Sequence, residues 1–500
     1  MPAVFSDLAL LRRRVLVDRP PRADGEFVVY WMTSARRLGW NHGLDRAVEL
    51  ASATGRPLLI VEALRCGYRW ASDRLHRFVL EGMAANARRA ATTAATYHPY
   101  VEPSAGAGKG LIATLSKRAV AIVADDFPTF FLPRMLAAAA TQVECRLEAI
   151  DANGLLPMAA ADREFATAHS LRRFLQTHLR RHLLAPPVAD PLARLRAPRL
   201  ARLPAEIARR WPAADAALLA ARPEELARLP IDHGVAPVEG VRGGTPAARA
   251  ALASFLDGRL ARYADERNQP DADVASGLSP WLHFGQLSVH EVVDELARRE
   301  RWSPESLPEG GKGAREGWWG ASRGAEAFLD ELVTWRELGF NLAHRRPLDH
   351  DRYESLPGWA RATLEKHRSD PRPDLPGLER LASAASGDEL WNAAQRQLAG
   401  EGRIHNYLRM LWGKRVLEWT EEPRAALEVL FELNNRFALD GRDPNSATGI
   451  LWCLGRHDRP WAPERPIFGV VRYMSSAAAR RKLDLDRYLA RWGERPELFA

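Results

Sequence analysis

Residues 27–32 read F-V-V-Y-W-M, an apolar run of the length of one buried strand. Three similar runs follow at 57–61 (P-L-L-I-V), 119–124 (A-V-A-I-V-A) and 143–150 (V-E-C-R-L-E-A-I). Between them, residues 44–53 and 72–90 carry apolar side chains at helical spacing. Strands that are apolar on both faces and alternate with helices are typical of a parallel sheet covered by helices. The sequence therefore predicts an α/β N-terminal domain with a Rossmann-like parallel sheet over residues 1–185.

The rest of the chain has a different pattern. No G-x-G-x-x-G follows any of the apolar runs, so the usual dinucleotide-binding signature is absent. Residues 186–244 are rich in Pro, Ala and Arg, which predicts a linker with short helices. After Thr245 strand signals almost disappear and amphipathic helical periods dominate. We therefore expect an all-α C-terminal domain over residues 245–500.

The composition excludes several classes of protein. The 500 residues carry a formal net charge of +8, which favours a polyanionic partner, although arginines spread over helix surfaces give the same value. Three cysteines occur in no metal-ligand spacing, so we expect neither a disulfide framework nor a metal site. No apolar run approaches the roughly 20 residues of a membrane helix, and the first 24 residues lack a secretory signal. We expect a cytoplasmic protein, nucleoid-associated in a prokaryote, with no membrane partner.

Two motifs could bind a ligand. Residues 263–288 read Y-A-D-E-R-N-Q-P-D-A-D-V-A-S-G-L-S-P-W-L-H-F-G-Q-L-S, in which Ser276 and Ser279 flank Gly277 before a helical run. Such groups at a helix start bind phosphate, and they also cap ordinary helices. In F-L-D-E-L-V-T-W-R-E, Glu331 and Trp335 are four residues apart, so an α-helix would place them on one side. A carboxylate beside an aromatic ring suits a flipped base, although such a pair is more often an ordinary surface Glu near a core Trp.

The densest motif is 386–419, S-G-D-E-L-W-N-A-A-Q-R-Q-L-A-G-E-G-R-I-H-N-Y-L-R-M-L-W-G-K-R-V-L-E-W. Ser386 and Glu389 have the spacing of a capping box that starts one helix, and a second helix is expected to begin near Ile404. Trp412 and Trp419 are two turns apart on that second helix. Two polar side chains and one flexible apolar side chain share another face of it, namely Asn406, Arg409 and Met410.

The last motif is 433–461, L-N-N-R-F-A-L-D-G-R-D-P-N-S-A-T-G-I-L-W-C-L-G-R-H-D-R-P-W. A buried arginine needs an acidic partner, and Asp440 is the candidate for Arg409. Asp440 could also cap a turn, since D-G and D-P-N are strong turn formers. The two interpretations are compatible.

Together these motifs resemble photolyases and cryptochromes, and most closely class II photolyases, which repair cyclobutane pyrimidine dimers. The similarity extends from about Tyr30, in V-V-Y-W-M-T-S-A-R-R-L-G-W-N-H-G-L, to Ser475. Glu331 and Trp335 have one more residue between them than in class I enzymes, a spacing that class II members share. The resemblance implies an α/β photolyase domain and an all-α domain that binds FAD, active as FADH⁻, and DNA lesions.

The resemblance also implies roles for individual residues. Glu331 would hydrogen-bond the pyrimidine, Trp335 and Trp452 would form the walls of the lesion pocket, and Met410 its floor. Electrons would pass through Trp419 (outermost) and Trp391 to Trp412, nearest the flavin. Asn434 would face the reactive flavin nitrogen, with Asn445 as the alternative. The flavin-binding residues implied are Tyr263, Ser276, Gly277, Leu278, Ser279, Asn406, Arg409, Asn434, Asp440 and Asn445.

The expected partner is UV-damaged DNA containing pyrimidine dimers, bound by a monomer. A second, antenna chromophore, deazaflavin or folate, is expected in the N-terminal domain, without an assigned binder. The main alternative is a cryptochrome-like blue-light photoreceptor that binds FAD without repairing DNA. A basic helical DNA-binding protein without cofactor would require every motif above to be coincidental.

Overall fold

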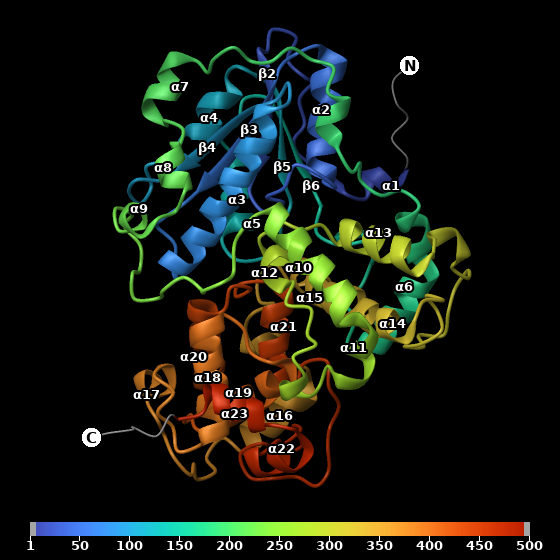
Figure 1. Cartoon of the computed structure of the whole chain (residues 1–500), viewed down its shortest axis with the longest axis vertical. Coiled ribbons are helices and arrows are strands. Elements are labelled where there is room, and N and C mark those ends of the chain that lie inside the picture. The colour runs from blue at the N-terminus through green and yellow to red at the C-terminus, as the bar shows by residue number, and fades with distance from the viewer. Residues whose placement is uncertain (1–6, 495–500) are drawn as a thin grey trace. The chain divides into compact units, whose positions relative to one another are not determined.

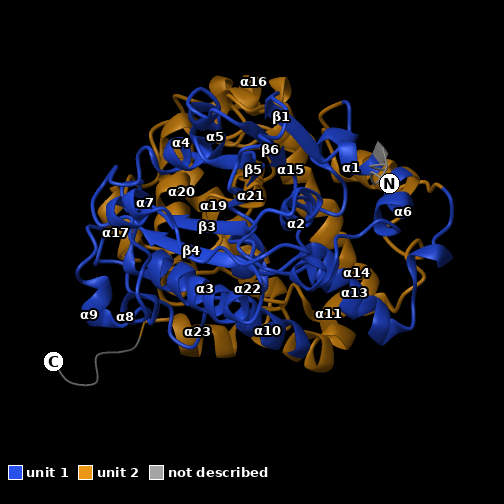
Figure 2. Ribbon diagram, turned by 90° about the horizontal axis from the view of Figure 1, so that it is seen from above, with its two compact units in different colours: residues 1–162, 178–253, 278–309 blue, residues 163–177, 254–277, 310–500 orange. Residues whose placement is uncertain are grey.

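The computed structural model describes residues 7–494, which form two compact units (Figures 1 and 2). Unit 1 contains residues up to 162 with 178–253 and 278–309, and unit 2 contains 163–177, 254–277 and the chain from 310 onward. Helices α6 (Ala168–Leu183) and α10 (Thr245–Gly258) each run from one unit into the other. The sequence predicted three consecutive ranges. In the structure each unit instead consists of three separate stretches of the chain, which alternate along the sequence.

A six-stranded sheet forms the core of unit 1, in the order β1-β6-β5-β2-β3-β4. All neighbouring strands are parallel except β1, which pairs antiparallel with β6 at one edge. The predicted α/β fold is therefore confirmed. The strands are β1 Arg13–Val17, β2 Phe27–Met32, β3 Leu58–Leu64, β4 Thr96–Val101, β5 Ala119–Asp125 and β6 Arg146–Ile150.

Helices cover both faces of this sheet, and the alternation of side chains along β2 shows how. Val28, Tyr30 and Met32 pack into one cluster with residues of α2 (His42–Thr54). The intervening residues Phe27, Val29 and Trp31 pack on the opposite face with residues of α4 (Leu111–Ser116), α5 (Leu132–Ala140) and α7 (Ala205–Arg210). A strand that buries both of its faces must be apolar throughout, which explains the uninterrupted run at 27–32.

Two strands and a packed connection were not predicted. Both missed strands, β1 and β4, lie at the sheet edges, where β1 carries arginines and β4 contains Pro99. Edge strands tolerate charges and proline, so they lack the continuous apolar run of a central strand. The segment 186–244, predicted as a linker, belongs to unit 1, and its Ile207 and Trp211 are buried against the sheet.

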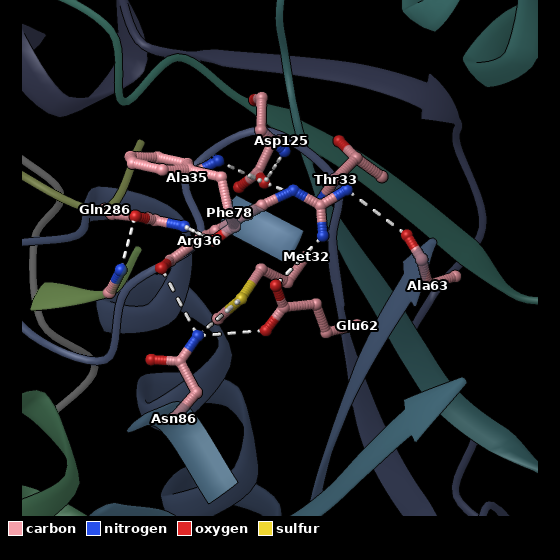
Figure 3. A network of polar contacts seen from close by, with 12 residues as sticks. Met32, Thr33, Ala35, Arg36, Glu62, Ala63, Phe78, Asn86, Asp125 and Gln286 are labelled. Atoms are coloured by element: carbon pink, nitrogen blue, oxygen red, sulfur yellow. Dashed lines mark hydrogen bonds and ion pairs between the residues drawn. The ribbon is translucent and has the colours of Figure 1, made fainter. Parts of the chain in front are cut away.

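Polar side chains gather at the carboxyl ends of β2, β3 and β5 (Figure 3). Asp125, the last residue of β5, accepts hydrogen bonds from the N–H groups of Thr33, Ser34 and Ala35 at 2.8–2.9 Å. Its second oxygen accepts the hydroxyl of Tyr30 at 2.6 Å. The turn after β2 is therefore held by a carboxylate of the same sheet.

A second polar group in the same view is centred on Glu62 of β3, which is fully buried. Its carboxylate accepts hydrogen bonds from Arg36 at 2.9 Å, Asn86 at 2.9 Å and the Tyr97 hydroxyl at 2.6 Å. A buried charge is tolerated only when it is paired and hydrogen-bonded, and these three donors meet that condition.

Unit 2 is helical, and its long helices enclose one hydrophobic core. Its central members are α18 (Glu389–Glu401), α19 (Asn406–Glu418), α20 (Pro423–Phe437) and α21 (Pro444–Cys453). Further helices include α11 (Leu260–Glu266), α14 (Arg323–Leu329), α15 (Arg336–Arg345), α16 (Gly358–Lys366), α17 (Leu378–Ala382), α22 (Ser476–Lys482) and α23 (Asp486–Trp492). The predicted helical domain is confirmed. Among residues 7–494, no helix has the length and apolarity needed to cross a bilayer.

We expect unit 1 to become less stable as the pH is lowered past about 6.5, the pKa of an exposed histidine. Burial, followed by the positive charge of Arg12, lowers the pKa of His42 and His290 well below that value and the pKa of His182 to about 3. These histidines stay neutral in the folded chain while the unfolded chain takes up protons. Each of the three histidines therefore lowers the free energy of unfolding by up to about 1.4 kcal/mol for each unit by which the pH falls.

The measurement is chemical unfolding at pH 7.5 and 5.5, followed by circular dichroism. His42→Gln should flatten the pH dependence, whereas the exposed His233→Gln should leave it as in the wild type. Equal slopes in the His42 variant and the wild type would contradict the assignment.

Candidate active site

Glu331 and Trp335 lie in a π-helical turn, Asp330–Trp335, between α14 and α15. The N–H of Arg336 donates to the carbonyl of Glu331, five residues earlier. The sequence predicted an α-helix here, and the structure instead inserts a wider turn into it. Such turns inside α-helices are rare and occur frequently at functional sites.

Two arginines fix this turn. The Glu331 carboxylate pairs with the guanidinium of Arg267, which follows α11. The neighbouring Asp330 is buried and accepts two hydrogen bonds from Arg172, at 2.7 and 2.9 Å. Desolvation raises the pKa of Glu331, and the pairing with Arg267 opposes that rise. Glu331 is therefore held in one orientation close to an arginine.

Trp335 and Trp452 stack on each other, with ring centroids 4.7 Å apart and planes 19° apart. Both rings are partly exposed. Trp452 belongs to α21, which approaches two other helices very closely. A Cβ on Gly339 of α15 would lie 2.8 Å from Asn445, and one on Gly413 of α19 would lie 2.3 Å from the sulfur of Cys453. Side chains larger than hydrogen at these two positions would displace the helix that carries Trp452.

The predicted pair of Arg409 and Asp440 is present but loose. One Nη atom of Arg409 lies 3.8 Å from Oδ1 of Asp440, an ion-pair distance beyond the range of a hydrogen bond. That Oδ1 atom is buried and accepts no hydrogen bond from the described residues. A buried carboxylate oxygen without a donor is unusual. Oδ1 of Asp440 is therefore available to accept a hydrogen bond from a ligand. Met410, the next residue, is partly buried and packs on the core.

The two candidate asparagines differ in environment. Asn434 on α20 is buried, and its amide nitrogen donates to Asn435 at 3.1 Å and to the hydroxyl of Ser446 at 2.9 Å. Both N–H groups are thus used within the protein, which fixes the amide and leaves its oxygen as the atom that can meet a ligand. Asn445, at the start of α21, is exposed, and its backbone N–H binds Asp443.

The predicted anion-binding segment is divided between the units. Tyr263, Ser276 and Gly277 belong to unit 2, whereas Leu278 and Ser279 belong to unit 1. Tyr263 is buried in an aromatic cluster, edge to face with Phe328. Gly277 has a φ of +70°, and a Cβ at this residue would lie no closer than 3.8 Å to its nearest neighbour, an arginine nitrogen. Asn406, which starts α19, is exposed.

The three predicted electron-transfer tryptophans form one contiguous row. Trp391 of α18 stacks on Trp412 with centroids 6.3 Å and planes 5° apart, and it meets Trp419 edge to face at 5.4 Å. The indole nitrogen of Trp391 donates to the carbonyl of Trp412 at 3.0 Å. Trp419, the predicted outer end of the row, is only 4% exposed and makes little contact with solvent.

Three polar residues of the site were not selected from the sequence. Arg267 binds Glu331, Gln395 accepts the indole N–H of Trp412 at 3.0 Å, and Arg415 lies over the ring of Trp419. Gln395 is four residues after Trp391 on one helix, a spacing that could have indicated it. Arg267 lies 64 residues from Glu331, and no local pattern connects them.

Comparison with known proteins gives a consistent set of relatives. No protein-family model matches the sequence. The chain is 33% identical to the deoxyribodipyrimidine photo-lyase of Methanothermobacter thermautotrophicus over 484 residues, 96% of this chain and 97% of that protein. Proteins of the same name from Oryza sativa subsp. japonica and Arabidopsis thaliana are 33% and 30% identical over 93% of this chain, and 87% and 88% of theirs. A class III photolyase structure from Agrobacterium tumefaciens shares the fold, with a TM-score of 0.67 over 94% of this chain and 86% of that chain at 17% identity.

Proposed function

Because this chain belongs to the deoxyribodipyrimidine photo-lyase family, we propose that it is a class II enzyme that splits cyclobutane pyrimidine dimers in UV-damaged DNA. Bound in its reduced form, FADH⁻, and excited by blue light, FAD would supply the electron that opens the dimer and then returns. The observation that carries the proposal is the combination of a paired carboxylate, Glu331, with the stacked rings of Trp335 and Trp452.

The tryptophan pair is suited to a base taken out of the duplex. Aromatic side chains stack on bases, and a pyrimidine dimer costs less to extrude because it stacks poorly. The centroids of Trp335 and Trp452 are 4.7 Å apart, which leaves no room for a base between them. The lesion must therefore either lie against the outside of the pair or separate the two rings as it binds.

Glu331 would bind the lesion through its second oxygen, because Oε1 is paired with Arg267. Desolvation raises the pKa of Glu331, and a proton on its second oxygen would let the carboxyl group donate a hydrogen bond to a pyrimidine carbonyl. Such a donor stabilises negative charge that develops on the base after it accepts an electron. Arg267 would hold the carboxyl group in place and add a positive charge nearby.

The polar groups that fit the flavin lie on α19, α20 and the loop before α21. Arg409 and Asp440 would hold its central ring, using the buried Oδ1 that lacks a donor among the described residues. Asn434 would present its amide oxygen to the reactive nitrogen, and its fixed orientation favours it over the exposed Asn445. Tyr263, Ser276, Gly277, Leu278, Ser279 and Asn406 would complete the site. An antenna chromophore and a monomeric state remain predictions.

The test is an absorption spectrum of the purified protein, followed by incubation with UV-irradiated oligothymidylate under blue light. Flavin absorbance with light-dependent recovery of the thymine band supports repair. Flavin without recovery would favour a photoreceptor, and a protein purified without flavin that cannot be reconstituted with FAD would contradict the proposal.

We further expect Trp391→Phe to slow photoreduction of oxidised flavin by about tenfold or more, because Trp391 is the middle member of the tryptophan row. Phenylalanine preserves packing and is much harder to oxidise. The measurement is the rate of flavin bleaching under blue light with excess thiol. Trp318→Phe is the matched control, since Trp318 is also buried beside another tryptophan, Trp319, at 4.9 Å. Equal slowing in both variants would argue against a specific route.

A further inference from the structure

An arginine covers the outer end of the tryptophan row. The guanidinium carbon of Arg415 lies 4.5 Å from the centroid of the Trp419 ring. Arg415 lies in the last turn of α19, and Trp419 is the residue that caps this helix, with its N–H bonded to the carbonyl of Arg415. A cation over an electron-rich ring attracts the neutral indole and repels an oxidised, positively charged one.

Two carboxylates balance this cation. Arg415 Nε lies 3.2 Å from Oδ2 of Asp388, and its Nη1 pairs with the Glu418 carboxylate. The three side chains are 19%, 10% and 14% exposed, so solvent and salt screen their charges only partly. Asp388 also accepts the backbone N–H of Trp391 at 3.1 Å, which places one of these carboxylates at the start of the helix that carries the middle tryptophan.

We propose that Arg415 and Glu418 set how long Trp419 holds the positive charge left behind when an electron moves inward through Trp391 and Trp412. This inference rests on the proposed function, in which bound flavin accepts that electron. The electron lost by Trp419 is restored by an external thiol, which is oxidised in turn. Arg415 thus acts through Trp419, as a residue that adjusts the stability of its oxidised form.

The structure predicts opposite effects for the two members of the pair. Arg415→Gln removes the cation and leaves two carboxylates near Trp419, so the tryptophan radical cation should live about threefold longer or more. Glu418→Gln leaves the arginine less compensated, so the lifetime should shorten by a similar factor of about three. Arg415→Lys retains the charge and should stay close to the wild type.

The experiment is transient absorption of the tryptophan radical after a blue-light pulse on the flavin-loaded protein. Arg424→Gln is the matched control, because Arg424 lies 4.5 Å over the ring of Tyr353 and pairs with Glu354 instead of contacting one of the three tryptophans. It should leave the radical lifetime unchanged. If the Arg415 cluster had only a structural role, Arg415→Gln and Glu418→Gln would change the radical lifetime in the same direction.

The outcomes separate the two proposals. Unchanged lifetimes in both variants, or shifts in the same direction, would overturn the role of Arg415 and leave the proposed repair function intact. A wild-type protein that binds flavin and repairs dimers without any tryptophan radical would also overturn it. A wild-type protein that binds no flavin would overturn both.

Discussion

Glu331→Ala is expected to lower the quantum yield of dimer repair by about tenfold or more while leaving flavin content unchanged. The variant removes a hydrogen bond to a group that becomes charged during the reaction, a loss of about 1.5–3 kcal/mol. It also leaves the Arg267 guanidinium without its carboxylate. Glu331→Gln retains a donor of similar shape and should show a smaller loss. The measurement is repair of a dimer-containing oligonucleotide per absorbed photon, starting from chemically reduced flavin.

Glu354→Ala provides the control for this experiment. It also deprives an arginine, Arg424, of its carboxylate partner, but at an exposed position. Its repair yield should match the wild type. A Glu331→Ala protein with full repair yield would remove Glu331 from the mechanism.

Trp452→Ala is expected to weaken binding of dimer-containing duplex by about tenfold to a hundredfold, because aromatic stacking contributes about 1–3 kcal/mol per base. Binding of undamaged duplex should change little, since phosphate contacts dominate it. Fluorescence anisotropy titrations with damaged and undamaged oligonucleotides give the two dissociation constants, whose ratio is the preference for damaged DNA. Trp335→Ala should act in the same direction, and the double variant should lose less than the sum, because the two rings contact each other.

Trp492→Ala is the appropriate comparison for the pocket tryptophans. Trp492 is also partly buried in unit 2, on α23, where its ring lies beside Gly400. It should leave the preference for damaged DNA unchanged. If all three alanine variants lost that preference equally, general loosening of unit 2 would explain the result better than stacking.

The sequence predicts the centre of each element better than its ends and edges. The central strands β2 and β5 were found because both of their faces are buried. The helix expected to start with a capping box at Ser386 in fact has Asp388 as its cap, bonded to the N–H of Trp391, while Ser386 binds Asn392. Neighbouring residues with similar capping chemistry compete, and tertiary contacts decide between them.

The site shows the same limit. The chain pattern indicated only that Trp412 and Trp419 lie two turns apart, and the order of the three tryptophans came from the family resemblance; their contacts with Trp391 depend on how two helices pack. The pairing of Glu331 with Arg267 and the fixing of Asn434 by Ser446 depend on how separate helices meet. The π-helical turn at 330–335 also could not be predicted from the local sequence, because ordinary helix-forming residues occupy it.

Asp125 affects which ligands the loop after β2 of unit 1 can bind. In many α/β proteins, backbone N–H groups in the loop after a strand hold the phosphate of a nucleotide. Here the N–H groups of Thr33, Ser34 and Ala35 already bind one oxygen of Asp125 (Figure 3). The loop carries its own internal anion, so a phosphate approaching these N–H groups would meet a negative charge in their place. An anion binding to these three N–H groups would first have to displace the Asp125 carboxylate.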